Sequence, residues 1–139
     1  MRTSSRLVAW VLMMALLPAA CGQRPPGESG LRDAFAAQLA ANSFLGDVQR
    51  NGDEITFSGP AAGGGSGAWR VRIDSAVVEE NADPAFPYKG TVMSSWYSNG
   101  QLVSPSGRES NLPVELTSNG LAQDCWALWD AGEARWEWE

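Results

Sequence analysis

Histidine is absent from the 139-residue chain, and its absence removes several kinds of chemistry at once. Ser-His-Asp and Cys-His catalytic arrangements, zinc sites with histidine ligands and the usual proton shuttle near neutral pH all need this side chain. Cysteine is scarce as well, since Cys21 and Cys125 are the only two. Any catalysis would therefore depend on carboxylates, hydroxyls or amines, and at most one disulfide can form within the chain.

Positive charge is also in short supply. The chain holds ten basic and sixteen acidic residues, and all sixteen acids follow Cys21, whereas Arg2 and Arg6 precede it. Without its first 20 residues the chain has eight basic residues against sixteen acidic ones, a net charge of −8. Such a surface repels phosphate backbones, so nucleic acid is not an expected partner.

The sequence lacks an apolar run long enough to cross a bilayer. The longest run, residues 7–17, has about half of the roughly 20 residues that a spanning helix needs, and Pro18 ends it. Arg2 and Arg6 form a positive head before this run, and small residues follow it, which is the layout of a secretory signal. We therefore predict a signal peptide over residues 1–20 and no spanning helix elsewhere.

The end of this segment reads Ala19-Ala20-Cys21-Gly22. It resembles the lipobox of bacterial lipoproteins, with Pro18 at the position where that family usually has an aliphatic residue. The resemblance implies that Cys21 becomes the mature N-terminus and carries a diacylglycerol on its sulfur, so that acyl chains such as palmitate hold the protein on the membrane. It also implies the periplasmic side of the outer membrane in a host with two membranes, because no Asp follows Cys21.

Two other outcomes stay open at this cysteine. Ordinary cleavage near Ala20 or Gly22 would leave a soluble secreted or periplasmic protein, and Cys21 could then form a disulfide with Cys125, because the envelope permits disulfides. If Cys21 is acylated, Cys125 has no partner within the chain. We then expect Cys125 to be a small buried apolar residue.

The remaining sequence divides into a linker and one domain. Residues 21–30 hold the lipidated cysteine and a stretch rich in proline and glycine, which predicts a flexible linker. Residues 31–139 are expected to form a single domain. Its first part, residues 31–41, places Leu31, Phe35 and Leu39 on one face, the spacing of an amphipathic helix.

From residue 44 onward the apolar period changes to two, which is typical of strands. Asn-Gly pairs at residues 51–52, 99–100 and 119–120 predict tight turns. The expected strands cover residues 44–50, 53–57, 69–78, 88–97, 101–103, 112–117, 121–129 and 135–139. Between them, the glycine-rich residues 59–67 predict a mobile loop and the acidic residues 79–83 a solvated turn. The predicted fold class is α+β, with one N-terminal amphipathic helix packed on a curved antiparallel β-meander of about five to seven strands.

Tryptophan is the unusual feature of the domain. Six tryptophans follow the signal, four of them within residues 126–138, and an exposed aromatic row can stack on sugar rings or anchor a protein partner. The alternative is that these side chains fill the core beneath the helix. The candidate binding residues are Trp96, Tyr97, Trp129, Trp136 and Trp138. If Trp126 points to one side of its strand, Trp129 points to the other.

Catalytic and metal sites are not expected. Lys89 precedes Ser94 and Ser95 on one predicted strand, but a Ser-x-x-Lys spacing is missing, and residues 79–83 do not have the spacing of a calcium loop. We therefore predict no enzyme, no cofactor and no metal. The favoured function is a membrane-tethered envelope domain that binds a protein or glycan through its Trp-rich sheet. The alternatives are a soluble secreted binding or inhibitor domain, and a small carboxylate-dependent hydrolase.

Overall fold

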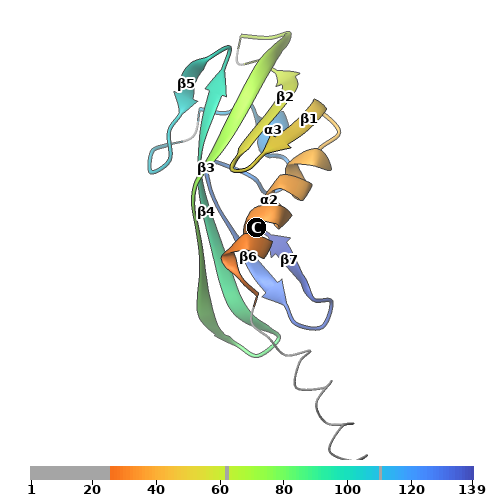
Figure 1. Cartoon of the computed structure of the whole chain (residues 1–139), viewed down its shortest axis with the longest axis vertical. Helices are drawn as coiled ribbons and strands as arrows, with labels where there is room; N and C mark the ends of the chain where they lie inside the picture. Colours follow the sequence, from red (N-terminus) through yellow and green to blue (C-terminus); the bar gives the residue numbers. More distant parts are fainter. Residues whose placement is uncertain (1–25, 62, 110) are drawn as a thin grey trace, which may run out of the picture.

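The computed structural model describes residues 26–61, 63–109 and 111–139. The predicted signal peptide, Cys21 and the first half of the predicted linker lie outside the described residues. Most of the described chain forms one curled antiparallel sheet of seven strands, accompanied by two helices (Figure 1). In chain order the elements are α2 (Glu28–Ala40), β1 (Gly46–Asn51), β2 (Glu54–Pro60), β3 (Ser66–Asp83), β4 (Phe86–Ser98), β5 (Gln101–Ser104), α3 (Val114–Thr117), β6 (Asp124–Asp130) and β7 (Arg135–Trp138).

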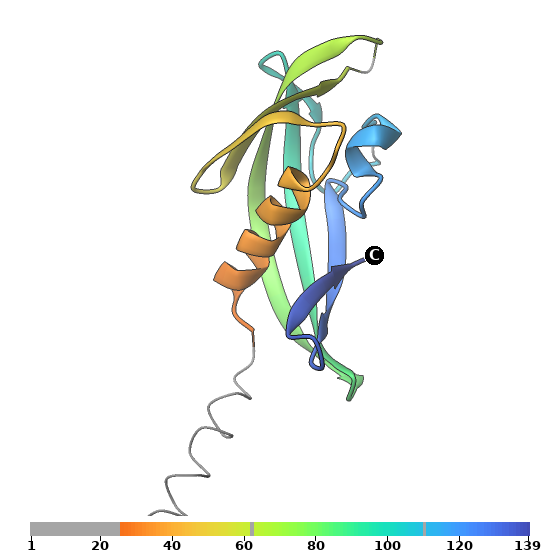
Figure 2. The same cartoon turned by 90° about the vertical axis from the view of Figure 1, so that its right-hand side faces the viewer.

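The predicted antiparallel sheet of about five to seven strands is confirmed. Its strand order is β1-β2-β3-β4-β6-β7, and β5 pairs with β4 off this path. β4 is the central strand because it pairs with β3 along one side and with two strands along the other: residues 89–93 with β6 and residues 96–98 with β5. In this order β1 and β7 are the two ends of the curled sheet, and α2 lies between them (Figures 1 and 2).

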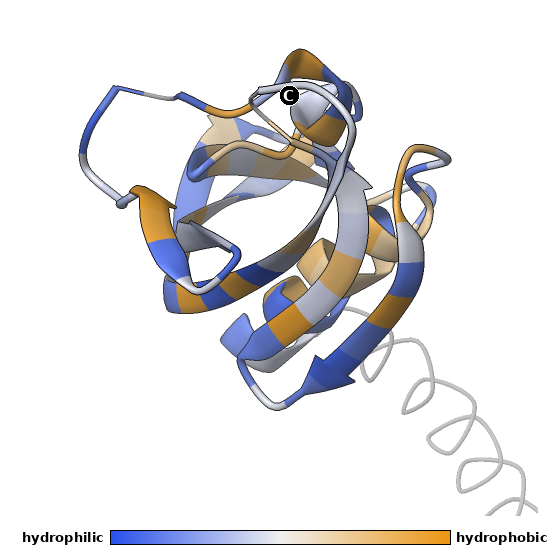
Figure 3. Ribbon diagram, turned by 90° about the horizontal axis from the view of Figure 1, so that it is seen from above, coloured by the Kyte–Doolittle hydropathy of each residue, from blue (hydrophilic) through white to orange (hydrophobic). Residues whose placement is uncertain are grey.

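The core lies on the inner face of the sheet, the face that packs against α2. Leu31, Phe35 and Leu39 of α2 have no exposed surface, and burying side chains of this size stabilises a fold by about 1.5–3 kcal/mol each. Viewed from above, the strands alternate between hydrophilic and hydrophobic residues as the sheet curls (Figure 3). This alternation places the apolar side chains on the inner face and the charged ones on the outer face.

A β-bulge interrupts the alternation in the middle of β3. The register with β4 shifts between Ile73 and Ser75, so Ile73 and Ala76 are both buried although three positions separate them. The bulge lets the long strand change its twist while keeping apolar side chains inward on both sides of it.

The structure corrects the boundaries predicted around β3. The predicted turn at residues 79–83 is wrong, because β3 continues to Asp83 and pairs Glu79 with Lys89 and Glu80 with Tyr88. The predicted loop at residues 59–67 is shorter than expected, since Gly59 still pairs with Gly67. Pairing with a neighbouring strand satisfies the main-chain groups of these residues, and this outweighs their low intrinsic preference for strands.

The predicted strand at residues 112–117 is also wrong. Residues 114–117 form the single-turn helix α3, with Pro113 at its N-cap position. Leu116 is fully buried on the inner face, where Gly59 provides room: a Cβ at position 59 would lie 3.2 Å from Leu116 Cδ2. A proline before the helix and one buried leucine therefore determine the local conformation.

Candidate functional site

The six described tryptophans separate into core and surface residues. Trp69 and Trp96 are buried in an aromatic cluster with Phe57, and their ring centroids lie 6.3 Å apart. Trp126 is 39% exposed on the outer face. The other three lie on β6 and β7: Trp136 is buried in the core, and Trp129 and Trp138 are partly buried and pack against it.

Trp96 and Tyr97 do not join these three. Trp96 has no exposed surface and donates from Nε1 to Ser94 Oγ over 2.9 Å, so it belongs to the core and cannot contact a ligand at the surface. This corrects its prediction as a binding residue, because the inner face of β4 is covered. Tyr97 lies on the opposite, outer face, where the Cζ of Arg70 sits 4.2 Å from its ring centroid.

The three remaining predicted residues converge on one groove. α2 and β7 lie beside one another in both side views (Figures 1 and 2), and a hollow of about 360 Å³ lies where they face each other. We call it the tryptophan groove. Its lining consists of Gly30, Ala34, Ala37, Gln38, Trp129, Ala134, Arg135, Trp136 and Trp138.

Ring packing fixes the wall that the indoles form. Trp129 and Trp136 meet edge to face with centroids 5.4 Å apart, and Trp138 packs edge to face on Phe35 of α2 at 5.9 Å. Trp136 is 8% exposed, and its Nε1 has no hydrogen-bond partner among the described residues. Aromatic pairs of this kind contribute about 0.5–1.5 kcal/mol beyond their buried area, so the wall is ordered before any ligand arrives.

The groove exists because the facing side of α2 is built from small residues. Gly30, Ala34 and Ala37 follow one another at helical spacing and leave space opposite the indoles. Gly90 on β4 sets the depth, since a Cβ there would lie 2.7 Å from Leu31 Cδ1 and 3.0 Å from Trp136 Cζ3. The sequence prediction missed these small residues; their recurrence at four and three positions along the helix is the signal that marks them.

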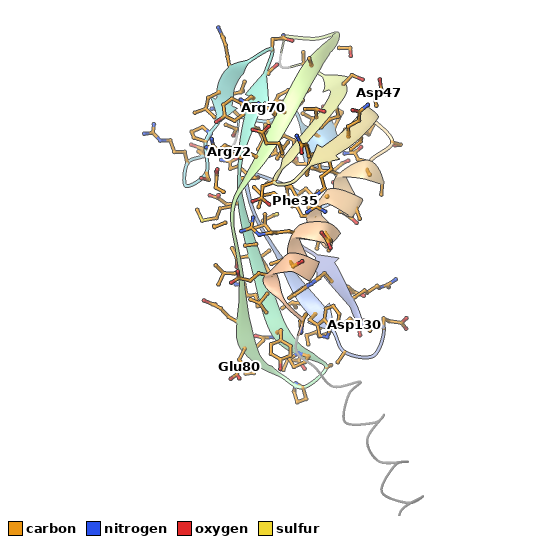
Figure 4. The ribbon with its side chains drawn as sticks, viewed as in Figure 1. Phe35, Asp47, Arg70, Arg72, Glu80 and Asp130 are labelled. Carbon is orange, nitrogen blue, oxygen red and sulfur yellow. The ribbon has the colours of Figure 1, made fainter. Side chains whose placement is uncertain are left out.

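A second hollow, of about 640 Å³, lies far from the tryptophan groove. Its lining includes the side chains of Asp47, Gln49, Thr56, Arg70 and Asn99. Figure 4 shows Asp47 and Arg70 toward one end of the molecule and Asp130, on the β6–β7 hairpin, toward the other. We call this second site the polar hollow. No sequence pattern pointed to it.

The serines near Lys89 do not form a catalytic dyad. Ser94 is buried on the inner face and accepts from Trp96, whereas Ser95 faces outward and donates to Asp74 Oδ2 over 2.5 Å. The ammonium of Lys89 lies elsewhere on the outer face, 4.7 Å from the ring centroid of Trp126. The strand therefore directs these groups to separate partners.

Asp74 gathers a polar cluster on the outer face. In addition to Ser95, it accepts from Arg72 Nε over 2.8 Å and from Ser106 Oγ over 3.0 Å. Partial burial alone would raise the pKa of Asp74, but the hydrogen bonds from Ser95, Arg72 and Ser106 outweigh it and hold the pKa below its ordinary value. A general acid or base near neutral pH needs the opposite shift. The cluster instead clamps the loop that carries Ser106 onto the sheet.

Metal and thiol chemistry have little basis in the part of the chain that the structure describes. No group of three or more His, Cys, Asp or Glu side chains in those residues could hold a metal ion. Cys125 is free and 3% exposed, and burial raises the pKa of its thiol to about 12. The other cysteine, Cys21, lies outside the described residues.

The fold and the groove together define a small β-rich domain with a hydrophobic recess between a helix and the end of a curled sheet. No family model matches the chain, and neither the curated proteins nor the solved structures include a significant match. None of the helices within residues 26–139 that the structure describes has both the length and the apolar character needed to cross a membrane. Nothing positive in these findings points to an enzyme.

Proposed function

We propose that this chain is a membrane-tethered binding domain of the cell envelope, and that the tryptophan groove is its binding surface. The tether is the diacylglycerol on Cys21 that the lipobox-like sequence implies. The predicted linker of residues 21–30 is too long, because α2 begins at Glu28, so residues 22–27 are the proposed connection between Cys21 and the domain. We also propose the α+β class for the domain, with α2 as the helix packed on the sheet. Its place is the envelope, on the periplasmic side of the outer membrane in a host with two membranes.

One observation carries the binding role: three tryptophans of the β6–β7 hairpin line a single recess opposite α2. Aromatic side chains that are held rigidly at a partly exposed site provide large contact area at a small cost in conformational entropy. Trp129 and Trp138 keep part of their surface accessible, whereas Trp136, in the same wall, is buried. A protein or glycan of the envelope is the expected partner.

The binding role is tested by filling the groove. Ala37→Leu places a larger side chain in the recess, whereas Ala40→Leu makes the same change at an exposed position of α2 outside the lining. Affinity capture from the host's own envelope, quantified by mass spectrometry, should recover a specific partner with wild type and with Ala40→Leu but not with Ala37→Leu. Equal recovery by all three proteins would refute the role of the groove.

The tether is tested separately. Growth with radiolabelled palmitate should label the wild type and not Cys21→Ser, and Cys21→Ser should leave the membrane fraction. A wild type without label would favour the soluble secreted alternative and leave the groove experiment unaffected.

A further inference from the structure

β7 is one end of the sheet, and its outer edge faces the tryptophan groove. Along one edge β7 pairs with β6, and Glu139 N donates to Trp126 O over 3.1 Å. Antiparallel pairing alternates, so Arg135 and Glu137 share the orientation of Glu139 and bond to β6. The main-chain N–H and C=O groups of Trp136 and Trp138 must then point away from β6, along the free edge of β7.

These outward groups lie along the groove. Trp136 and Trp138 belong to its lining, and the residues of α2 opposite them are Gly30, Ala34 and Ala37, which present no hydrogen-bonding side chain. Within the described residues, no hydrogen bond from another element reaches the main chain of Trp136 or Trp138. An unpaired strand edge of this kind is a template for another strand.

Apart from the indole N–H groups, of which Trp136 Nε1 has no partner within the described residues, the polar side chains of the lining are already engaged. Gln38 Nε2 donates to Asn119 O over 3.1 Å, and Arg135 forms an ion pair of 3.4 Å with Glu137. A saccharide would need free side-chain donors and acceptors to satisfy its hydroxyls. An extended peptide needs main-chain partners, and the free edge of β7 supplies these.

Charge specifies the peptide further. The segment from β6 through β7 to residue 139 carries five acidic side chains and one basic one, and that base, Arg135, is paired with Glu137. The acids are Asp124, Asp130, Glu133, Glu137 and Glu139. None of these five acids lines the tryptophan groove, but they make the β6–β7 segment acidic overall, and this favours a cationic segment over an anionic one.

We propose that an extended, cationic segment of a partner protein adds as a strand to the free edge of β7, with alternate apolar side chains entering the tryptophan groove. This inference rests on the proposed function, because it takes the groove as the binding surface. Gly120 limits the position of the added strand. A Cβ added at Gly120 would lie 3.1 Å from Trp138 Cβ, so the loop before β6 closes the groove at that end. The segment enters from the open end, beside Gly30 and Arg135.

The probe is a heptapeptide of alternating lysine and valine, added to the ¹⁵N-labelled protein purified as the host processes it. Two further peptides carry N-methyl groups, one on the valines and one on the lysines. Because alternate N–H groups of a strand point to opposite sides, one methylated peptide should lose about tenfold or more in affinity, as expected for two lost hydrogen bonds, and the other should bind like the parent. The Trp136 and Trp138 amides should gain protection from hydrogen exchange, and Ala37→Leu but not Ala40→Leu should abolish binding.

Several results would overturn strand addition. They are equal binding of both methylated peptides, preference for a glutamate–valine peptide, or amide protection of Trp136 and Trp138 in the free monomer.

Binding of an N-acetylglucosamine hexamer without amide protection would assign the groove to glycans. Protection that rises with protein concentration would assign the edge to a second copy of the chain. If none of the peptides binds but an envelope partner is still captured through the groove, this inference is refuted and the proposed function is retained. If that capture is absent as well, both are refuted.

Discussion

Gln38 and Asn119 exchange two hydrogen bonds across 81 positions of sequence. Gln38 Nε2 donates to Asn119 O over 3.1 Å, and Asn119 Nδ2 donates to Gln38 O over 2.6 Å. The carbonyl of Gln38 belongs to the last turn of α2, where carbonyls have no partner within the helix. Asn119 therefore serves as a cap from a distant loop, and it fixes the end of α2 that closes the tryptophan groove.

Replacing Asn119 with alanine should lower the free energy of unfolding by about 1–3 kcal/mol, because the Gln38 carbonyl loses its partner in a partly buried place. Urea denaturation followed by tryptophan fluorescence measures the change. Asn111→Ala is the control, since Asn111 is exposed. Equal stability of the two variants would show that the cap contributes nothing.

Gly90→Ala should destabilise the fold and shift α2 relative to the sheet. The added methyl would lie 2.7–2.8 Å from the δ carbons of Leu31, which is fully buried and cannot move aside freely. Overpacking of this kind costs about 1–3 kcal/mol. Gly63→Ala, where a Cβ meets nothing within 4 Å, provides the matched control. Denaturation curves that coincide for the two variants would contradict the packing described here.

Stability should depend on pH through Asp74. Its pKa is lower in the folded than in the unfolded chain, so the unfolded state takes up the proton first as pH falls. The stabilisation is complete above the ordinary pKa of 3.8 and is lost as the pH falls through the folded value. Asp74→Asn should cost about 1.5–3 kcal/mol at pH 7, the usual value for hydrogen bonds to a charged group, and less at pH 2.

The control for this carboxylate is Glu133→Gln, which removes an exposed acid from the β6–β7 turn. Its effect should be small at both pH values. A deficit of Asp74→Asn that stays constant from pH 7 to pH 2 would mean that the carboxylate charge has no part in the clamp.

Two tryptophans of neighbouring strands should respond very differently to truncation. Trp96→Ala removes a fully buried ring from the cluster with Phe57 and Trp69 and should cost about 3–5 kcal/mol. Trp126→Ala removes a ring that is 39% exposed and contacted by Lys89, a contact worth about 0.5–1 kcal/mol at such a site. Melting temperatures distinguish the two, and comparable losses would contradict the assigned faces.

Local patterns were sufficient for the type of sheet and for the turn at residues 99–100, but not for the predicted turn at residues 79–83, which lies within β3. Asn99 and Gly100 both have positive φ angles, of 49° and 82°, as a tight hairpin between β4 and β5 requires. Residues 112–117 show where the approach fails. A period of two over so short a stretch also fits one helical turn after a proline, and the helical turn is the one that accompanies the burial of Leu116 close to Gly59. That contact is invisible in the local sequence.

The groove could be predicted only in part, for the same reason. The density of tryptophans identified Trp129, Trp136 and Trp138, but no pattern tells which strand face the helix covers. The helix covers the face that carries Trp96 and leaves the face that carries Trp126 exposed, although polar and apolar residues alternate along both strands. The opposite wall comes from small residues of α2 that meet β7 about a hundred positions later, a relationship that only the folded sheet creates.

Cys125 should be inert in the folded protein. Burial raises the pKa of its thiol to about 12, so little thiolate exists at pH 8, and its 3% exposure leaves a reagent no access. N-ethylmaleimide should therefore leave Cys125 unmodified in native protein and label it after unfolding in urea, with mass spectrometry locating the adduct. Ser118→Cys, at an exposed position, is the control that must label in the native state. Rapid native labelling of Cys125 would contradict its burial, and a disulfide between Cys125 and Cys21 would contradict both its burial and the proposed lipid tether.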